Sequence, residues 1–267
     1  MHARIRAAVS TTKAVVATAR DKEITFLAAA VAYYAFASLL PALLLLLVVA
    51  TTVGGASFAE RLVTQTSGFL TPAGQEAITE AIADAPGAGG ATVIGIVLLT
   101  WSTLKVFRAL DTAFLTVYGQ TDTAGFGGQL RDAVLVLVGI GVGILIMVVL
   151  GVVLAALPLG PLGWLVGVLG LPGVLALALL PVYRQFPNPP ISVRQALPGT
   201  VFAAVGWTLL QAGFQIYAAS APQYAAYGVI GGVLLLVTWL YLAANIVILG
   251  AIVNAVVAGV DSVATPI

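Results

Sequence analysis

The twenty residues "AAAVAYYAFASLLPALLLLL", from 28 to 47, contain no charged side chain. As an α-helix this run is about 30 Å long, which matches the hydrocarbon thickness of a bilayer. Its end, from Leu43 to Val49, is apolar at every position, whereas a membrane-spanning β-strand would alternate apolar with polar side chains. The stretch therefore predicts a transmembrane helix.

The rest of the chain repeats this pattern. Of its 267 residues, 61% are hydrophobic and 8% are charged, too few to cover a water-soluble fold with polar surface. The expected fold is an all-α membrane protein, a six-transmembrane-helix bundle that forms a single membrane domain over residues 1–267. The expected spans are 26–52, 91–110, 133–157, 162–182, 199–218 and 228–257.

The distribution of positive charge predicts the orientation, because Lys and Arg favour cytoplasmic loops. Apart from Arg61, the cations lie before the first span, between spans four and five, or on either side of the connection between spans two and three, which Lys105, Arg108 and Arg131 flank. We therefore expect a multi-pass protein of the cytoplasmic membrane with both termini cytoplasmic. Its cytoplasmic parts would include the basic N-terminus, 1–25, and the loop 183–198.

The longest predicted excursion outside the bilayer is the external loop 54–90, between spans one and two. It places Phe58, Leu62, Phe69 and Ile78 at roughly helical intervals with carboxylates between them. This spacing predicts one or two amphipathic helices that cap the bundle.

Prolines separate spans four and five. Pro187, Pro189 and Pro190 prevent one continuous helix, because proline lacks a donor and clashes with the preceding turn. Ser192 and Gln195 have capping-box spacing and predict a short helical turn, after which Pro198 would open span five.

Lys105, Arg108 and Asp111 follow one another at intervals of three, so they share one side of a helix. They form either a cationic vestibule for an anionic substrate or lipid headgroup, or anchors whose side chains reach the inner membrane surface. The depth of Lys105 distinguishes the two interpretations.

Gln211, Gln215 and Asn245 lie within spans five and six and predict an interior polar seam, or simply hydrogen bonds between helices. Pro41 and Pro172 favour either broken helices around a substrate or ordinary kinks. Gly139 and Gly143 form a GxxxG pair that favours close helix packing.

Enzymatic patterns are poor. Cysteine is absent, His2 is the one histidine, and "GAGG" at 87–90 lacks the lysine of a phosphate loop. We expect no catalytic residue, no metal and no cofactor. Membrane lipids are the expected partners and nucleic acid is not, while association into a homo-oligomer is left open.

Several stretches, taken in order, resemble the YihY/BrkB family of integral membrane proteins. The likeness rests on the run 28–47 with Tyr33, Tyr34, Ser38 and Pro41, on Tyr183, Arg184, Pro187, Asn188, Arg194, Pro198 and Gly199 in the prolyl connection, and on 214–256 in the last two spans. One departure is Ile252, which stands where the family usually carries glutamate.

The resemblance implies a six-helix inner-membrane protein. Family members have carried a ribonuclease label widely regarded as mistaken, and labels concerning envelope integrity, serum resistance and lipid export. We add Tyr183 and Asn188 of the shared connection to the substrate-binding candidates.

The leading hypothesis is non-ATP-driven transport or translocation of a lipid or another anionic envelope component. Arg108, Arg184 and Arg194 would attract its headgroup. The alternative is a non-transporting scaffold for envelope assembly that acts through the external loop. A catalytic role is a third hypothesis that no carboxylate pair or histidine cluster supports.

Overall fold

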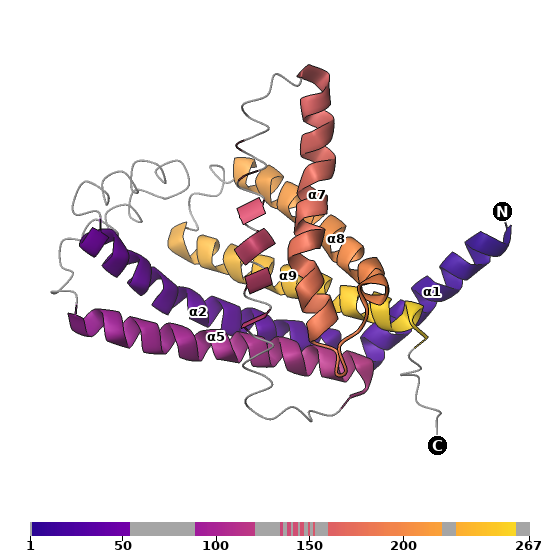
Figure 1. The fold of residues 1–267 in the computed structure, drawn as a ribbon, viewed down its shortest axis with the longest axis horizontal. Coiled ribbons are helices and arrows are strands. Elements are labelled where there is room, and N and C mark those ends of the chain that lie inside the picture. The colour runs from indigo at the N-terminus through magenta and orange to yellow at the C-terminus, as the bar shows by residue number, and fades with distance from the viewer. Residues whose placement is uncertain are drawn as a thin grey trace. The chain divides into compact units, whose positions relative to one another are not determined.

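The structure is a computed structural model, and the residues it describes are helical, with short turns and no strand among them (Figure 1). These residues are 2–53, 89–120, 160–220 and 228–259, together with 134, 135, 138, 139, 141–143, 145, 146, 149 and 152. The predicted all-α class is confirmed for this part of the chain.

The helices largely follow the predicted spans. They are α1 (His2–Asp21), α2 (Ile24–Val53), α5 (Gly89–Tyr118), α7 (Gly160–Gln185), α8 (Val193–Ser220) and α9 (Gly228–Val257). The predicted span 133–157 is helical at the positions described within it. The predicted external loop lies outside the described residues, apart from 89 and 90, which begin α5.

Two helical segments of the described chain are long and apolar enough to cross a membrane by length and composition: Val193–Tyr217 and Gly231–Val257. A shorter apolar segment covers Ile24–Leu39. The count of six spans stays a prediction. Both α2 and α7 run through their internal prolines, Pro41 in α2 and Pro172 in α7. Of the two interpretations of these prolines, continuous helices favour ordinary kinks over broken helices around a substrate.

Helix α1 was not predicted from the sequence, which treated the N-terminus as a basic segment. It ends where the amide of Lys22 donates to the carbonyl of Thr18 at 2.9 Å. Glu23 then adopts a left-handed conformation, with φ of 48°, before α2 begins. A left-handed residue interrupts the α-helical hydrogen-bond pattern, so α1 and α2 are separate helices.

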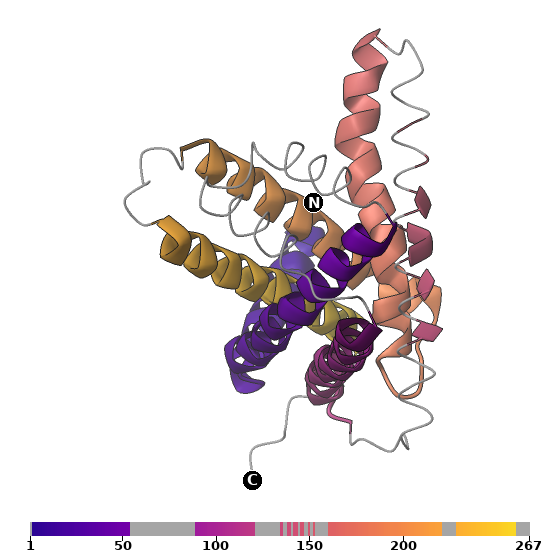
Figure 2. The same cartoon turned by 90° about the vertical axis from the view of Figure 1, so that its left-hand side faces the viewer.

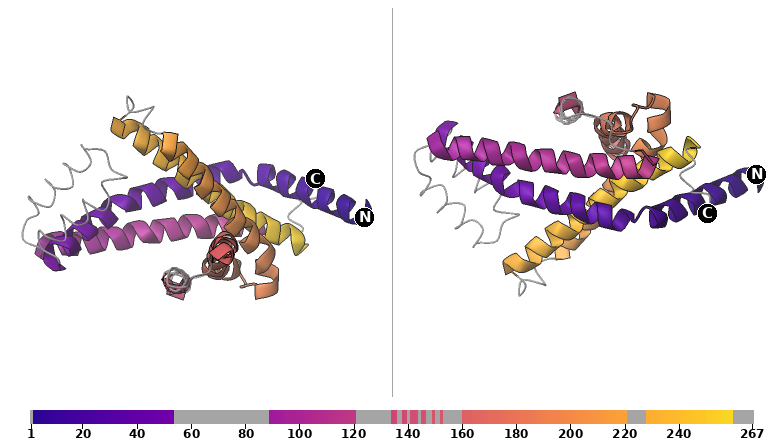
Figure 3. Two further views of the ribbon diagram at one scale, coloured as in Figure 1. Left: turned by 90° about the horizontal axis from the view of Figure 1, so that it is seen from above. Right: turned by 90° about the horizontal axis from the view of Figure 1, so that it is seen from below.

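The chain divides into two compact units. The first comprises residues 1–31, 107–219 and 241–267, and the second comprises 32–106 and 220–240. The apolar core of the first unit includes Phe114 of α5, Tyr183 of α7, and Ile248 and Ile252 of α9, all fully buried. In the second unit, the parts of α2 and α5 that fall within residues 32–106 lie side by side (Figures 1 and 3).

The connection between α7 and α8 confirms part of the sequence-based prediction. Helix α7 ends at Gln185, before the prolines. The capping box forms, because the Ser192 amide donates to Gln195 Oε1 at 3.0 Å and the Gln195 amide donates to Ser192 Oγ at 3.4 Å. Pro198 does not open the helix as predicted; α8 begins at Val193 and includes it.

Helices α8 and α9 cross (Figure 3), and their backbones come into close contact at Gly199. The buried amide of Asn254 on α9 bridges them: Oδ1 accepts from the Gly199 amide at 2.6 Å, and Nδ2 donates to the Ala196 carbonyl at 3.0 Å. A Cβ on Gly199 would meet the Gly250 carbonyl oxygen, and one on Gly250 would lie 2.7 Å from the Gly199 carbonyl. Two glycines and one amide therefore fix this crossing.

A second close approach joins α7 to the helical residues between 134 and 152 (Figure 2). A Cβ built on Gly139 would lie 2.5 Å from Pro181 Cγ, and one on Gly143 would lie 2.5 Å from Ala178 Cβ and 2.8 Å from Ala178 Cα. The GxxxG pair therefore packs as predicted, with glycine required at both positions.

Replacing Asn254 with alanine is expected to lower the free energy of unfolding by about 1–2 kcal/mol, because the buried Gly199 amide loses its acceptor and the Ala196 carbonyl, which also accepts from Thr200 Oγ1, loses one donor. Asn245→Ala is the matched control, since Asn245 Nδ2 donates to the Tyr241 carbonyl of its own helix and not to another helix among the described residues. This substitution should cost under about 0.5 kcal/mol. Thermal unfolding in detergent measures both. Equal losses would contradict the bridging role.

Gly143→Ala is expected to destabilise the protein by about 1–3 kcal/mol, because its methyl group collides with the backbone of Ala178. Gly141, two residues earlier, has nothing within 4 Å of a built Cβ. Gly141→Ala should be neutral or slightly stabilising, since alanine favours helix by about 1 kcal/mol over glycine. The midpoint of thermal unfolding compares the variants, and a smaller loss for Gly143→Ala than for Gly141→Ala would refute the packing.

Candidate functional site

Lys105 of α5 is exposed and lies against two aromatic rings of the second unit. Its Nζ is 5.4 Å from the ring centroid of Trp101, one turn earlier on α5, and 5.8 Å from that of Tyr34 on α2. Tyr34 in turn meets Tyr33 edge-on, with centroids 5.4 Å apart. The distances from Lys105 Nζ to the two rings, Trp101 and Tyr34, are within the range of cation–π attraction.

The direction of the Lys105 side chain follows from helix geometry, because side chains tilt toward the N-terminus of their helix. Trp101 lies on that side, so the ammonium group is held toward the start of α5. Under the predicted topology that direction leads into the bilayer. If the span ends at residue 110 as predicted, Lys105 would lie about 8 Å inside that end, with its charge turned inward.

The other cations predicted to bind substrate belong to the first unit, and each is exposed. Arg108 follows Lys105 on α5, Arg184 lies in the last turn of α7, and Arg194 lies in the first turn of α8. Asp111 is half-buried on α5. All three arginines are therefore accessible to an anion.

The candidates at the end of α7 contribute to packing. Tyr183 is fully buried, and its hydroxyl donates to the Val247 carbonyl of α9 at 2.8 Å. The ring of Phe114 lies 5.6 Å from that of Tyr183 and 5.2 Å from that of Phe186, which joins α5 to α7. The backbone amide of Asn188 donates to Gln120 Oε1 at 2.8 Å. These contacts fix the loop that separates Arg184 from Arg194.

The predicted polar seam is not joined by hydrogen bonds within the described chain. Gln211 and Gln215 are exposed on α8. Asn245 is half-buried and donates to the Tyr241 carbonyl at 2.8 Å. Two polar residues in the described parts of these helices are buried, Thr200 on α8 and Asn254 on α9. Thr200 donates to the Ala196 carbonyl of its own helix, whereas Asn254 bonds across from α9 to α8.

Tyr118, at the end of α5, was missed in the sequence. Its side chain is buried, and its hydroxyl has no hydrogen-bond partner among the described residues. Burial raises the pKa of Tyr118 from 10.0 to about 12, because the tyrosinate would lose its hydration. The apolar pattern of α5 could have suggested burial, but not the missing partner.

No group of three or more His, Asp or Glu side chains that could hold a metal ion occurs in the part of the chain that the structure describes. The site around Lys105 consists of its own ammonium group and the aromatic faces of Trp101 and Tyr34. An ammonium group and aromatic faces do not supply the oxygen ligands that Mg²⁺ and Ca²⁺ prefer.

Comparison with known proteins establishes the family. The family model of the virulence factor BrkB matches residues 15–265. The chain belongs to the BrkB family of membrane proteins. This confirms the resemblance found in the sequence. No solved structure matches the chain.

Three BrkB relatives illustrate the range. A UPF0761 membrane protein of Alkalilimnicola ehrlichii is 28% identical over 247 residues, 84% of this chain and 53% of the relative. YfkH of Bacillus subtilis, named as ribonuclease-like, is 39% identical over 85 residues, 32% of this chain and 31% of the relative. A UPF0761 membrane protein of Pseudoalteromonas translucida is 32% identical over 95 residues, 35% and 32% of the two chains. The chain thus spans about half, or less, of the length of these relatives.

Position 252, where the resemblance implied a departure from the family pattern, lies in the core. Ile252 is fully buried on α9, between the buried residues Ala251 and Asn254. A carboxylate at position 252 would be removed from water, which is costly unless it is paired. Isoleucine at this position fills apolar space.

The two buried tyrosines give a paired prediction. Tyr118→Phe should leave stability at neutral pH unchanged or higher, because it removes an unpaired hydroxyl. Tyr183→Phe should lower the free energy of unfolding by about 1 kcal/mol, because the Val247 carbonyl loses its donor. Denaturant unfolding in detergent compares them, and a larger loss for Tyr118→Phe would contradict the assignment.

The pKa of Tyr118 also predicts a pH dependence. Between its ordinary pKa of 10.0 and the folded-state value of about 12, the unfolded chain loses a proton that the folded chain keeps. The free energy of unfolding should therefore fall as pH rises through this window. Tyr118→Phe should flatten part of that fall, and an identical pH profile for wild type and variant would refute the burial effect.

Proposed function

We propose that this BrkB protein translocates a lipid, or another anionic component of the cell envelope, across the membrane without ATP. The observation that carries the proposal is the exposed ammonium group of Lys105 against Trp101 and Tyr34. The sequence supplies no phosphate loop for a nucleotide. The substrate's own gradient, or that of an ion, would supply the driving force.

The energetics of Lys105 favour an anionic ligand. A cation at the centre of a membrane helix costs about 2.5–3.5 kcal/mol, and less toward the ends. A desolvated cation–π contact returns about 2 kcal/mol. The two rings therefore offset much of the cost while leaving one side of the ammonium group uncovered, and a phosphate at that side would supply the remaining stabilisation.

The rings also oppose the alternative interpretation of Lys105 as a simple anchor. An anchor extends its side chain toward the headgroup layer. Contact with Trp101 holds the ammonium in the opposite direction under the predicted topology. In this position the ammonium group of Lys105 would contact a lipid headgroup while that headgroup crosses the membrane. Arg108, Arg184 and Arg194 would attract the headgroup at the cytoplasmic surface.

Vesicles containing the purified protein and fluorescently labelled phosphatidylglycerol test the proposal. Labelled headgroups should move between leaflets faster than in protein-free vesicles. Lys105→Gln should raise the half-saturating fraction of labelled lipid about tenfold, since about 1.4 kcal/mol of charge and ring contact is lost. Lys105→Arg should keep most of the activity, because arginine also stacks on aromatic rings.

The matched control is Lys22→Gln, which removes a cation that lies 3.8 Å from Asp21 outside the predicted spans. It should leave the rate unchanged, whereas Arg184→Ala should lower it. Equal rates in vesicles with and without the wild-type protein would reject translocation. An equal loss for Lys22→Gln and Lys105→Gln would reject the specific role of Lys105.

The second candidate is a scaffold for envelope assembly. Its support is that Arg184, Arg194, Gln211 and Gln215 are all exposed rather than gathered around an interior path. Deleting residues 57–85 should then abolish envelope function while leaving the helices folded by circular dichroism. Normal envelope function after this deletion would reject the scaffold.

A further inference from the structure

Helix α1 has two unlike faces within the first unit. On one face, Thr18 is buried, and Val15 and Ala19 pack against the apolar core. On the opposite face, Val9 and Val16 remain 49% and 46% exposed. One side of α1 is thus attached to the bundle, while the other side carries exposed valines.

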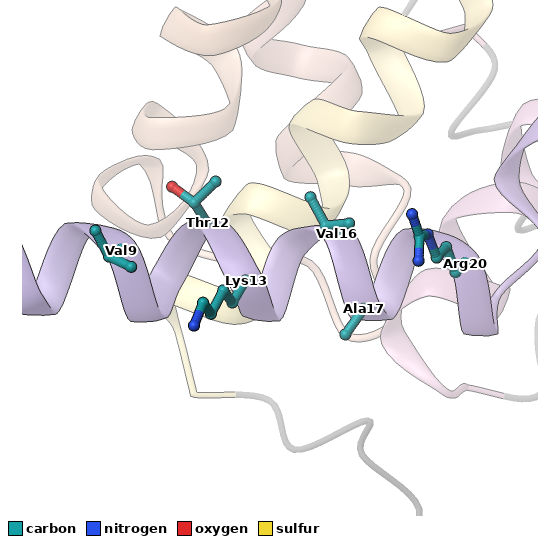
Figure 4. A pocket seen from close by; sticks show the side chains of 6 residues that line it. All are labelled: Val9, Thr12, Lys13, Val16, Ala17 and Arg20. Atoms are coloured by element: carbon teal, nitrogen blue, oxygen red, sulfur yellow. The ribbon is translucent and has the colours of Figure 1, made fainter.

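Val9, Lys13, Val16 and Arg20 form the exposed stripe of α1. They follow one another at intervals of four, three and four residues, so they occupy one side of the helix within about 60°. Together with Thr12 and Ala17 they line a shallow surface hollow along the helix (Figure 4). Apolar and cationic side chains alternate along its length.

The charge of the exposed stripe is entirely positive. Both of its charged members, Lys13 and Arg20, are exposed. The nearest carboxylate in the sequence, that of Asp21, lies about 100° around the helix and 3.8 Å from Lys22 Nζ. A binding partner that complements this stripe would therefore carry negative charges opposite Lys13 and Arg20. Between those charges it would accept the small apolar side chains of Val9 and Val16.

We propose that the exposed stripe of α1 docks on the anionic phospholipid surface of the membrane in which the bundle sits. Lys13 and Arg20 contact lipid phosphates, and Val9 and Val16 enter the boundary between headgroups and acyl chains. The left-handed residue Glu23 separates α1 from α2, so the docking helix is distinct from the spanning helix. This inference does not depend on lipid translocation.

A bilayer is the favoured occupant because α1 lies two residues before an apolar helix of the same chain. The membrane surface is thus already near the stripe, at a high effective concentration. Anionic lipid favours each nearby Lys or Arg about fivefold, and the two valines add a small apolar contribution. A protein partner would gain no such advantage.

The absence of native cysteine allows one fluorescent probe to be placed at a time. An environment-sensitive dye on Val16→Cys would report from the stripe. The same dye on Ser10→Cys, which is also exposed but about a third of a turn away, is the matched control. The full chain is studied in bilayers of zwitterionic lipid, with and without phosphatidylglycerol.

The dye at position 16 should shift to the blue when phosphatidylglycerol is present, and the dye at position 10 should shift less. Lys13→Gln or Arg20→Gln should each weaken the docking equilibrium about fivefold, whereas Lys13→Arg should not. High salt should also reverse the shift. Equal spectra in the two bilayers, equal shifts at both positions, or a shift that depends on protein concentration would overturn the proposal, the last by indicating a second copy of the chain.

Discussion

The side-chain amide of Asn254 is the interaction on which the described fold of the first unit depends. It accepts from the Gly199 amide and donates to the Ala196 carbonyl, just where Pro198 leaves α8 without a backbone donor. A side chain that enters the hydrogen-bond pattern beside a proline stabilises an otherwise weakened turn. Since Gly199 and Gly250 face each other there, the amide also sets the spacing of α8 and α9.

This arrangement reflects the solvent. Apolar side chains gain little by leaving lipid for another helix, so membrane helices associate through close packing and a few hydrogen bonds. The first unit uses both: glycine contacts at positions 139, 143, 199 and 250, and bonds from Asn254 and Tyr183. The exposed cations and the aromatic contact of Lys105 lie outside these packed places. A bundle fixed at a few points leaves its remaining surface to lipid, which is consistent with a protein whose proposed ligand is itself a lipid.

The sequence predicted what depends on local pattern. The limits of α9, the capping box at Ser192 and Gln195, and the packing of Gly139 and Gly143 all follow from spacing along one helix. The start of α8 was predicted wrongly, because the capping box at Ser192 and Gln195 starts the helix at Val193 and Pro198 is accommodated inside it. Within the site, the i to i+4 contact of Trp101 and Lys105 was readable in principle, but Tyr34 joins them only through the pairing of α2 and α5. The burial of Asn254 and of the Tyr118 hydroxyl likewise depends on neighbours distant in the sequence.

Hydrogen exchange at the Gly199 amide tests the central claim most directly. In the wild-type protein in a lipid bilayer, this amide should exchange as slowly as its neighbours deep in α8, because Asn254 Oδ1 holds it at 2.6 Å in a buried crossing. In the Asn254→Ala variant it should become one of the fastest-exchanging amides of α8, while amides at the far end of that helix stay protected. Fast exchange in the wild type, or slow exchange that the substitution leaves unchanged, would contradict the account.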